Sequence, residues 1–274
     1  MQEEDLGAKA VSSLLERLNV TPAGADAFVG PASRGGGPRL FGGMVAGQAV
    51  VAAARTVEGP QIHSLHAYFL QPGDPALDVS YRVDRLKEGK NFQARQITAR
   101  QSERVIFSMQ ASFQRAEPGF SHQDPMPDAP DPDTLQERGF GFWGASSPVR
   151  MRDCDGGDFD RAAKNGMRRV WMKPSAALPE DPVLHLGLLV FATDMTLVMT
   201  GMLPHPELRQ RPRGGASLDH AVWFHRQPLF DDWLLYTMAT PVAHASRPLM
   251  HGAMYRRDGT RVASIAQEGL IRFR

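Results

Sequence analysis

The chain has one cysteine among its 274 residues, Cys154, so it cannot form an intrachain disulfide. That count fits a reducing compartment. The N-terminal MQEEDLGAKA is acidic and lacks the basic and apolar segments of a signal peptide. The longest apolar run is interrupted by Asp194, which argues against a membrane span. We therefore expect a cytoplasmic protein with no membrane partner.

An excess of charge of either sign is also missing. The formal net charge is +1, which argues against a strong general attraction to nucleic acid or to an anionic membrane. Metal-site patterns are missing as well, since there is no HExxH and no cysteine pair. His63 and His66 are three apart on an expected strand and so face opposite sides. We expect neither a metal nor a cofactor.

Patterns for covalent catalysis are absent too. The sequence has no G-x-S-x-G elbow, and Cys154 lies between Asp153 and Asp155, whose charges oppose thiolate formation. The glycine-rich stretch GGMVAGQ (42–48) lacks the Lys-Ser/Thr pair of a P-loop and the spacing of a dinucleotide fingerprint. Its glycines are more typical of a buried helix that starts close to a sheet.

What the sequence does contain is an aspartate inside LLVFATDMTLVM (188–199). The preceding Asp181-Pro182 predicts a helix start, and the pattern predicts one helix over 182–200. Helical neighbours three and four residues from Asp194 are all apolar: Val190, Phe191, Leu197 and Val198. A buried carboxylate needs polar partners, a raised pKa, or both. The alternative is a helix edge at which Asp194 reaches solvent.

A segment rich in proline and aspartate, 117–147, divides the chain into two halves, 1–116 and 148–274. The halves resemble each other in three places, taken in the same order. FGGMV (41–45) matches FATDM (191–195), SLHAYF (64–69) matches SLDHAVWF (217–224), and RVIFSMQ (104–110) matches RVASIAQ (261–267). We interpret these matches as an internal repeat.

Each half has the same predicted order: one apolar helix, then several strands. The helices are 42–57 and 182–200. The strands are 63–70, 78–86, 91–101 and 104–114 in the first half, and 217–225, 233–240, 250–257 and 261–272 in the second. Asp258-Gly259 lies between the last two and predicts a hairpin. The pattern predicts an α+β fold in which each half wraps a curved antiparallel sheet around a buried helix.

Several long segments resemble one known family. FGGMVAGQAVVAA, HSLHAYFLQPGD, ASLDHAVWFHR, WLLY and VASIAQEGLIR are similar to segments of acyl-CoA thioesterase II, the double-hotdog thioesterases. The resemblance runs from about Leu14 to Arg272. It implies two hotdog units joined by a long connector, and hydrolysis of fatty acyl-CoA to a fatty acid and coenzyme A. By analogy with other hotdog proteins, it also implies a homo-oligomer.

The same resemblance implies a site without a covalent nucleophile, in which Asp194, Ser217 and Gln267 activate a water. Asp194 would take the proton from that water. Ser217 can both donate and accept a hydrogen bond, and the Gln267 amide can do the same. The N-terminus of the helix at 42–48 could also contribute to binding the thioester oxygen. Taken singly, Ser217 and Gln267 would be ordinary structural polar groups; the joint match favours the site.

The repeat predicts that only the second half carries this site. The alignment places Met44 opposite Asp194, Ser64 opposite Ser217, and Gln110 opposite Gln267. The first half would then keep the hydroxyl and the amide but lack the carboxylate. Two other functions remain open: a non-catalytic acyl-CoA-binding hotdog protein, or an enzyme like enoyl-CoA hydratase, although no hydratase motif is present.

Overall fold

The computed structural model describes residues 3–33, 37–137, 147–209 and 215–272. Two buried helices lie at its centre, α2 (Gly42–Ala54) and α4 (Pro182–Asp194). Side chains of both helices are buried on every side, as the uninterrupted apolar sequences predict. The helix α4 starts where its sequence predicts, because the Asp181 side chain accepts the backbone N–H of Val183 at 3.0 Å.

Strands of the first half surround α2. They are β1 (Thr21–Gly24), β2 (Ala27–Gly30), β3 (Gln61–Phe69), β4 (Val79–Glu88), β5 (Phe92–Gln101) and β6 (Arg104–Gln114). Their order in the sheet is β1-β2-β4-β5-β6-β3, so the first-half sheet ends at β3. The four longest of these strands match the predicted ranges closely. The short strands β1 and β2 were not predicted.

The second half repeats this plan. Its strands are β7 (Val149–Asp153), β8 (Arg168–Pro174), β9 (Gly215–Ser217), β10 (Asp219–Phe224), β11 (Leu234–His244), β12 (Arg247–Arg256) and β13 (Arg261–Ile271). Their order is β10-β13-β12-β11-β8-β7, with β9 paired to β13. The predicted hairpin at Asp258-Gly259 joins β12 to β13, and Gly259 has the positive φ of +85° that the turn requires.

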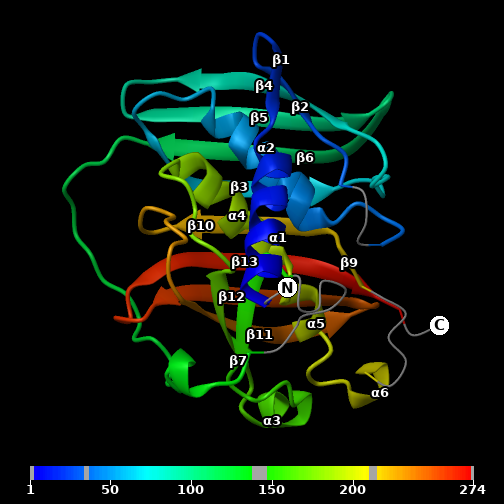
Figure 1. Cartoon of the computed structure of the whole chain (residues 1–274), viewed down its shortest axis with the longest axis vertical. Helices are drawn as coiled ribbons and strands as arrows, with labels where there is room; N and C mark the ends of the chain where they lie inside the picture. Colours follow the sequence, from blue (N-terminus) through cyan, green and yellow to red (C-terminus); the bar gives the residue numbers. More distant parts are fainter. Residues whose placement is uncertain (1–2, 34–36, 138–146, 210–214, 273–274) are drawn as a thin grey trace.

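The two halves share one continuous sheet, because β3 pairs with β10 in antiparallel register. Figure 1 shows the strands stacked from the first half at the top to the second half at the bottom, with α2 and α4 near the middle of the view. In this register Ala67 lies opposite His220. The division at 1–116, 117–147 and 148–274 stays a prediction.

The central helices cross at two glycines. A Cβ atom on Gly47 would lie 2.9 Å from the carbonyl oxygen of Gly187, and one on Gly187 would lie 3.5 Å from that of Gly47. A side chain at either position would push the helices apart, so glycine here permits close packing. The approach is reciprocal, as expected at a local two-fold axis. Leu18, the last residue of α1 (Glu3–Leu18), packs against both glycines.

The described part of the connector, residues 117–137, lies against the second half. Trp171 donates its indole N–H to the carbonyl oxygen of Pro130 at 2.9 Å, and Arg169 donates to that of Asp128 at 2.6 Å. Arg257 forms an ion pair with Asp133 at 2.6 Å. Apart from one 3-10 turn at Pro132–Thr134, this described stretch has no regular element, as its prolines predict. Figure 1 shows it as the green trace at the left.

The expected helix over 182–200 is wrong beyond Asp194. Helix α4 ends there, and a short helix, α5 (Leu197–Thr200), follows after a bend. The Tyr236 hydroxyl donates to the carbonyl oxygen of Thr193 at 3.0 Å, a partner that comes from β11 and not from the next helical turn. Asp194 is therefore a C-terminal helix residue.

By length and composition alone, the segment Pro182–Thr200 could cross a membrane, contrary to the expectation from sequence. Of an 18-residue window in this segment, 83% is buried inside the protein. The apolar sequence therefore forms the core of the second half.

Candidate active site

Asp194 lies between the ends of the two central helices. It is the last residue of α4 and is only 5% exposed. Its carboxylate faces the start of α2, where the backbone N–H of Gly43 donates to it. Phe41, the N-cap residue of α2, provides no side-chain cap, so the carboxylate of the other helix occupies that role.

Ser217 reaches Asp194 because of a β-bulge. In the pairing of β9 with β13, Ser217 lies opposite Gly269, whereas Ala221 of β10 lies opposite Ala266, a register that differs by one residue. A one-residue shift turns a side chain to the other face of a sheet. Ser217 thus faces the core, where its hydroxyl donates to Asp194 Oδ1 at 2.7 Å.

Gln267 of β13 completes the group. It is 0% exposed, and its strand neighbours on the same face, Ala263 and Ile265, are buried too. Its Nε2 atom donates to Ser217 Oγ at 3.0 Å, and its amide also donates to the Asp194 carboxylate. The structure therefore brings all three predicted site residues into one hydrogen-bonded cluster, although they are far apart in the sequence.

Burial raises the pKa of the Asp194 carboxyl above its usual value, since it disfavours the charged form. The His220 charge and hydrogen bonds from Ser217, Gln267 and Gly43 act in the opposite direction, but burial has the larger effect. The C-terminal end of α4 also opposes a negative charge, while the N-terminal end of α2 favours one. The Asp194 carboxylate therefore has a raised pKa, and hydrogen-bond donors hold it in position.

His220 and Thr193 belong to the same cluster. Neither residue was predicted as a site residue from the sequence. His220 is 0% exposed; its Nδ1 atom contacts Gln267 Oε1 and its Nε2 atom lies 2.9 Å from Thr193 Oγ1. The signal available in the sequence was weak, because Thr193 is one of several small residues on an apolar helix.

The structure corrects the repeat alignment in the helices. The reciprocal crossing pairs Gly47 with Gly187, so Ala54, and not Met44, is the structural counterpart of Asp194. Next to Ala54, Arg55 forms an ion pair with Asp181 at 2.5 Å, and Asp181 already caps α4. At the position equivalent to Asp194 the first half therefore has an alanine and not the predicted methionine, and it has no carboxylate there.

The alignment is also wrong in the strands. The hairpins β5-β6 and β12-β13 have a register shift at the same place, between Ala99 and Arg100 in one and between Met254 and Tyr255 in the other, so Ala111 takes the place of Gln267. Gln110 is exposed on the opposite face. Ser64 precedes the core residue Leu65 and so faces away from the core. The first half thus keeps neither the hydroxyl nor the amide at a matching site.

Gln110 and Gln267 provide a matched pair of variants. We expect Gln267→Ala to reduce kcat by roughly 10²-fold, the size expected when one aligned donor is lost from a reaction site. Gln110→Ala should leave kcat unchanged, because that side chain is exposed on the outer face. Steady-state rates and melting temperatures of both variants provide the measurement. Equal losses in the two would contradict the assignment of the site to the second half.

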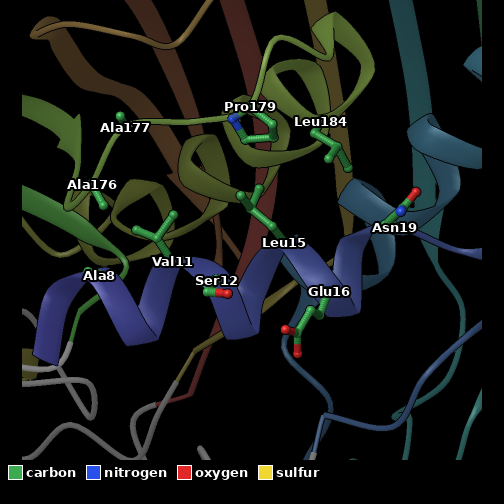
Figure 2. Close-up of a pocket in the computed structure, with 10 residues that line it drawn as sticks. All are labelled: Ala8, Val11, Ser12, Leu15, Glu16, Asn19, Ala176, Ala177, Pro179 and Leu184. Carbon is green, nitrogen blue, oxygen red and sulfur yellow. The ribbon is translucent and has the colours of Figure 1, made fainter. Parts of the chain in front are cut away.

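A cavity of about 390 Å³ lies elsewhere, between α1 and the segment that leads into α4. Figure 2 shows Leu15 of α1 and Asn19, just after α1, on one side and Pro179 and Leu184 on the other. None of the three predicted site residues lines it, so this cavity is not where they act.

Cys154 is a free cysteine, and its side chain is buried. Burial, followed by the charges of Asp153 and Asp155, raises the pKa of the Cys154 thiol to about 12, against the opposing effect of Arg169. A thiol of this kind stays protonated at neutral pH.

Within the described residues, no group of three or more His, Cys, Asp or Glu side chains could hold a metal ion.

Fold and site together define a double-hotdog protein with a buried carboxylate, hydroxyl and amide in its second half. Two family models match the chain: "Acyl-CoA thioesterase" over residues 151–270, and "Acyl-CoA thioesterase N-terminal domain" over residues 30–114. The human protein named acyl-coenzyme A thioesterase 8 is 34% identical, over 93% of this chain and 87% of its own length. Acyl-CoA thioesterase 2 of Haemophilus influenzae is 33% identical, over 86% of this chain and 88% of its own length.

Among solved structures, an acyl-CoA thioesterase II, TesB2, from Mycobacterium marinum superposes with a TM-score of 0.82. It is 38% identical and covers 95% of this chain and 98% of its own. The chain therefore belongs to the acyl-CoA thioesterase II family. It is an enzyme of the thioesterase class, and the predicted α+β double-hotdog fold is confirmed.

Proposed function

We propose that the protein hydrolyses fatty acyl-CoA to a free fatty acid and coenzyme A with a water molecule activated by Asp194, Ser217 and Gln267. The observation that carries this proposal is the direct hydrogen bonding of these three side chains in one buried cluster. Family membership supports the thioester substrate. The first half contributes the N-terminal end of α2.

The two carboxylate oxygens of Asp194 have different surroundings. Oδ1 accepts from Ser217. Oδ2 lies beside Gly42, where a Cβ atom would be 2.8 Å from it and 2.9 Å from the Phe69 ring. The missing side chain of Gly42 thus lets Oδ2 and the Phe69 ring lie close to the backbone of α2, and we place the attacking water on the Asp194 carboxylate.

In the first step, Asp194 takes a proton from this water while the water oxygen forms a bond to the thioester carbonyl carbon. Such general-base help contributes roughly 10²–10⁴-fold in rate. Negative charge develops on the carbonyl oxygen, and the positive end of the α2 helix dipole favours that charge. Gln267 holds Ser217, and Ser217 holds the carboxylate in position.

In the second step, the bond from carbon to sulfur breaks and the thiolate of coenzyme A leaves with the bonding electron pair. The proton held by Asp194 goes to the leaving sulfur, which restores the carboxylate. No covalent enzyme intermediate is needed. This agrees with the raised pKa of Cys154, which excludes a reactive thiolate at that residue near neutral pH.

The test is release of free thiol from a series of acyl-CoA substrates of increasing length, measured with a thiol-reactive dye. We expect release at a rate proportional to enzyme concentration, and the length series identifies the preferred chain. Binding of acyl-CoA without release would indicate a binding protein, and loss of enoyl absorbance without release would indicate hydratase chemistry. Either result would overturn the proposal.

Two further properties belong to the proposal. We propose that chains associate into homo-oligomers, and that the protein works in the cytoplasm. Light scattering coupled to size exclusion tests the first property by giving the mass of the particle in solution.

A further inference from the structure

His220 is buried at the centre of the site cluster without a role in the proposed reaction. Both of its ring nitrogens have partners inside the protein: Nδ1 contacts Gln267 Oε1, and Nε2 lies 2.9 Å from Thr193 Oγ1. Burial lowers the pKa of His220, so the ring is neutral near neutral pH. A neutral imidazole carries one hydrogen, and its other nitrogen can only accept.

The positions of the hydrogens follow from Asp194 outward. An ionised carboxylate only accepts, so the Ser217 hydroxyl donates its single hydrogen to Oδ1 at 2.7 Å. Ser217 must then accept the bond from Gln267, and the NH₂ group is the only donor on that side chain. The amide oxygen of Gln267 is consequently turned toward His220.

The same reasoning fixes the histidine. Because the Gln267 oxygen can only accept, His220 Nδ1 carries the hydrogen and donates it. Nε2 then has a lone pair and accepts from the Thr193 hydroxyl at 2.9 Å. That hydroxyl also donates to the carbonyl oxygen of Val190 at 2.7 Å, so its single hydrogen is shared between these two acceptors. In this series of hydrogen bonds, Thr193 donates to His220, His220 to Gln267, Gln267 to Ser217 and Ser217 to Asp194.

We propose that Thr193 and His220 are positioning residues for catalysis: they hold the Gln267 amide with its NH₂ group toward Ser217 and Asp194. The inference rests on the proposed function of those three residues. With the other tautomer, Nδ1 would need a donor, so the amide would turn over. Its oxygen would then face Ser217 and compete with Asp194 for the serine hydrogen.

Tyr236 supports the arrangement from the opposite side. Its hydroxyl donates to the carbonyl oxygen of Thr193 at 3.0 Å and is fully buried. A Cβ atom on Gly252 of the neighbouring strand would lie 2.5 Å from the Tyr236 ring, so glycine makes room for it. The end of α4 is thereby fixed in the place where Thr193 can reach His220.

The test compares Thr193→Val with Thr193→Ser. Valine has nearly the shape of threonine but leaves His220 Nε2 without a partner, whereas serine keeps the hydroxyl. We expect Thr193→Val to lower kcat roughly tenfold, as for the loss of one buried hydrogen bond, with KM changed less than twofold. Thr193→Ser should stay within about twofold of the wild type in both quantities. Both are assayed well below their melting temperatures.

A second pair tests His220 itself. Asparagine can place an amide N–H near the position of Nδ1, so His220→Asn should retain more of kcat than His220→Leu, which has no donor. If both His220 variants fail to fold, the Thr193 pair decides by itself.

The outcomes are separable from those of the proposed function. Equal kcat values for Thr193→Val and Thr193→Ser would overturn the positioning role, and the assignment of Asp194 would remain. A lowered melting temperature in Thr193→Val with unchanged kcat would also overturn it, because the role would then be structural. Activity that persists in Asp194→Asn would overturn the proposed function instead.

Discussion

Asp194→Asn is expected to lose activity and to gain stability. The substitution removes the base that takes the proton from water, and kcat should fall by roughly 10²–10⁴-fold. Met44→Asp should not restore activity in the double variant, because Met44 is not the structural counterpart of Asp194. Thiol release by the single and double variants provides the measurement, and substantial activity in Asp194→Asn would contradict the mechanism.

The stability gain follows from the raised pKa of Asp194, for which burial is the main cause. In the unfolded chain this carboxyl ionises near 3.8, but in the folded protein it holds its proton to a higher pH. Between the two values the native state binds more protons, so its stability falls as the pH rises. Above the folded pKa the whole cost of the buried charge is present.

The neutral amide in Asp194→Asn carries no such cost, so the variant should melt at a higher temperature than the wild type at pH 8. The difference should shrink as the pH falls through the folded pKa and vanish below about 3.8. Melting curves across this pH range test the sign of the difference in melting temperature between Asp194→Asn and the wild type. A variant that melts at a lower temperature at pH 8 would mean that the donors around Asp194 outweigh the cost of its burial.

Gly42→Ala is expected to have the second largest effect. A Cβ atom there would lie 2.8 Å from Asp194 Oδ2 and 2.9 Å from the Phe69 ring, which is too close for either to stay in place. The carboxylate must shift, and a displacement of about 1 Å at a reacting group can cost roughly 10²-fold in rate.

Gly119→Ala is the control, because nothing lies within 4 Å of the added Cβ atom. We expect kcat of this control to equal that of the wild type. Gly42→Ala should remain folded, since alanine is favoured over glycine within helices. Wild-type kcat in Gly42→Ala would show that the position of the Asp194 carboxylate does not matter for the reaction, which would contradict the proposed mechanism.

Much of the fold could be predicted from sequence because its signals are local. The apolar runs predicted both central helices, Asp181-Pro182 predicted the start of α4, and Asp258-Gly259 predicted the final hairpin. The boundaries of β6 agree with the prediction. The short strands β1 and β2 were missed, because a stretch of four residues has too little periodicity to identify it.

The repeat alignment failed because it matched identical residues that lie on opposite faces of the sheet. Gln110 and Gln267 both end an Arg-Val strand motif, yet a shift of one residue in register turns one outward and the other inward. Ser64 and Ser217 differ in the same way, because the bulge that turns Ser217 inward lies between β9 and β10. A bulge depends on pairing with a distant strand, so the local sequence does not reveal it.

By itself, the sequence determined the family, the α+β class, and an aspartate that needs polar partners inside an apolar helix. These depend on composition, periodicity and motifs along the chain. Only the tertiary structure decided what surrounds that aspartate: the end of α4, the start of α2, the bulge at Ser217 and the partners of His220. The physical reason is that hydrogen-bond direction and burial depend on contacts between segments far apart in the sequence.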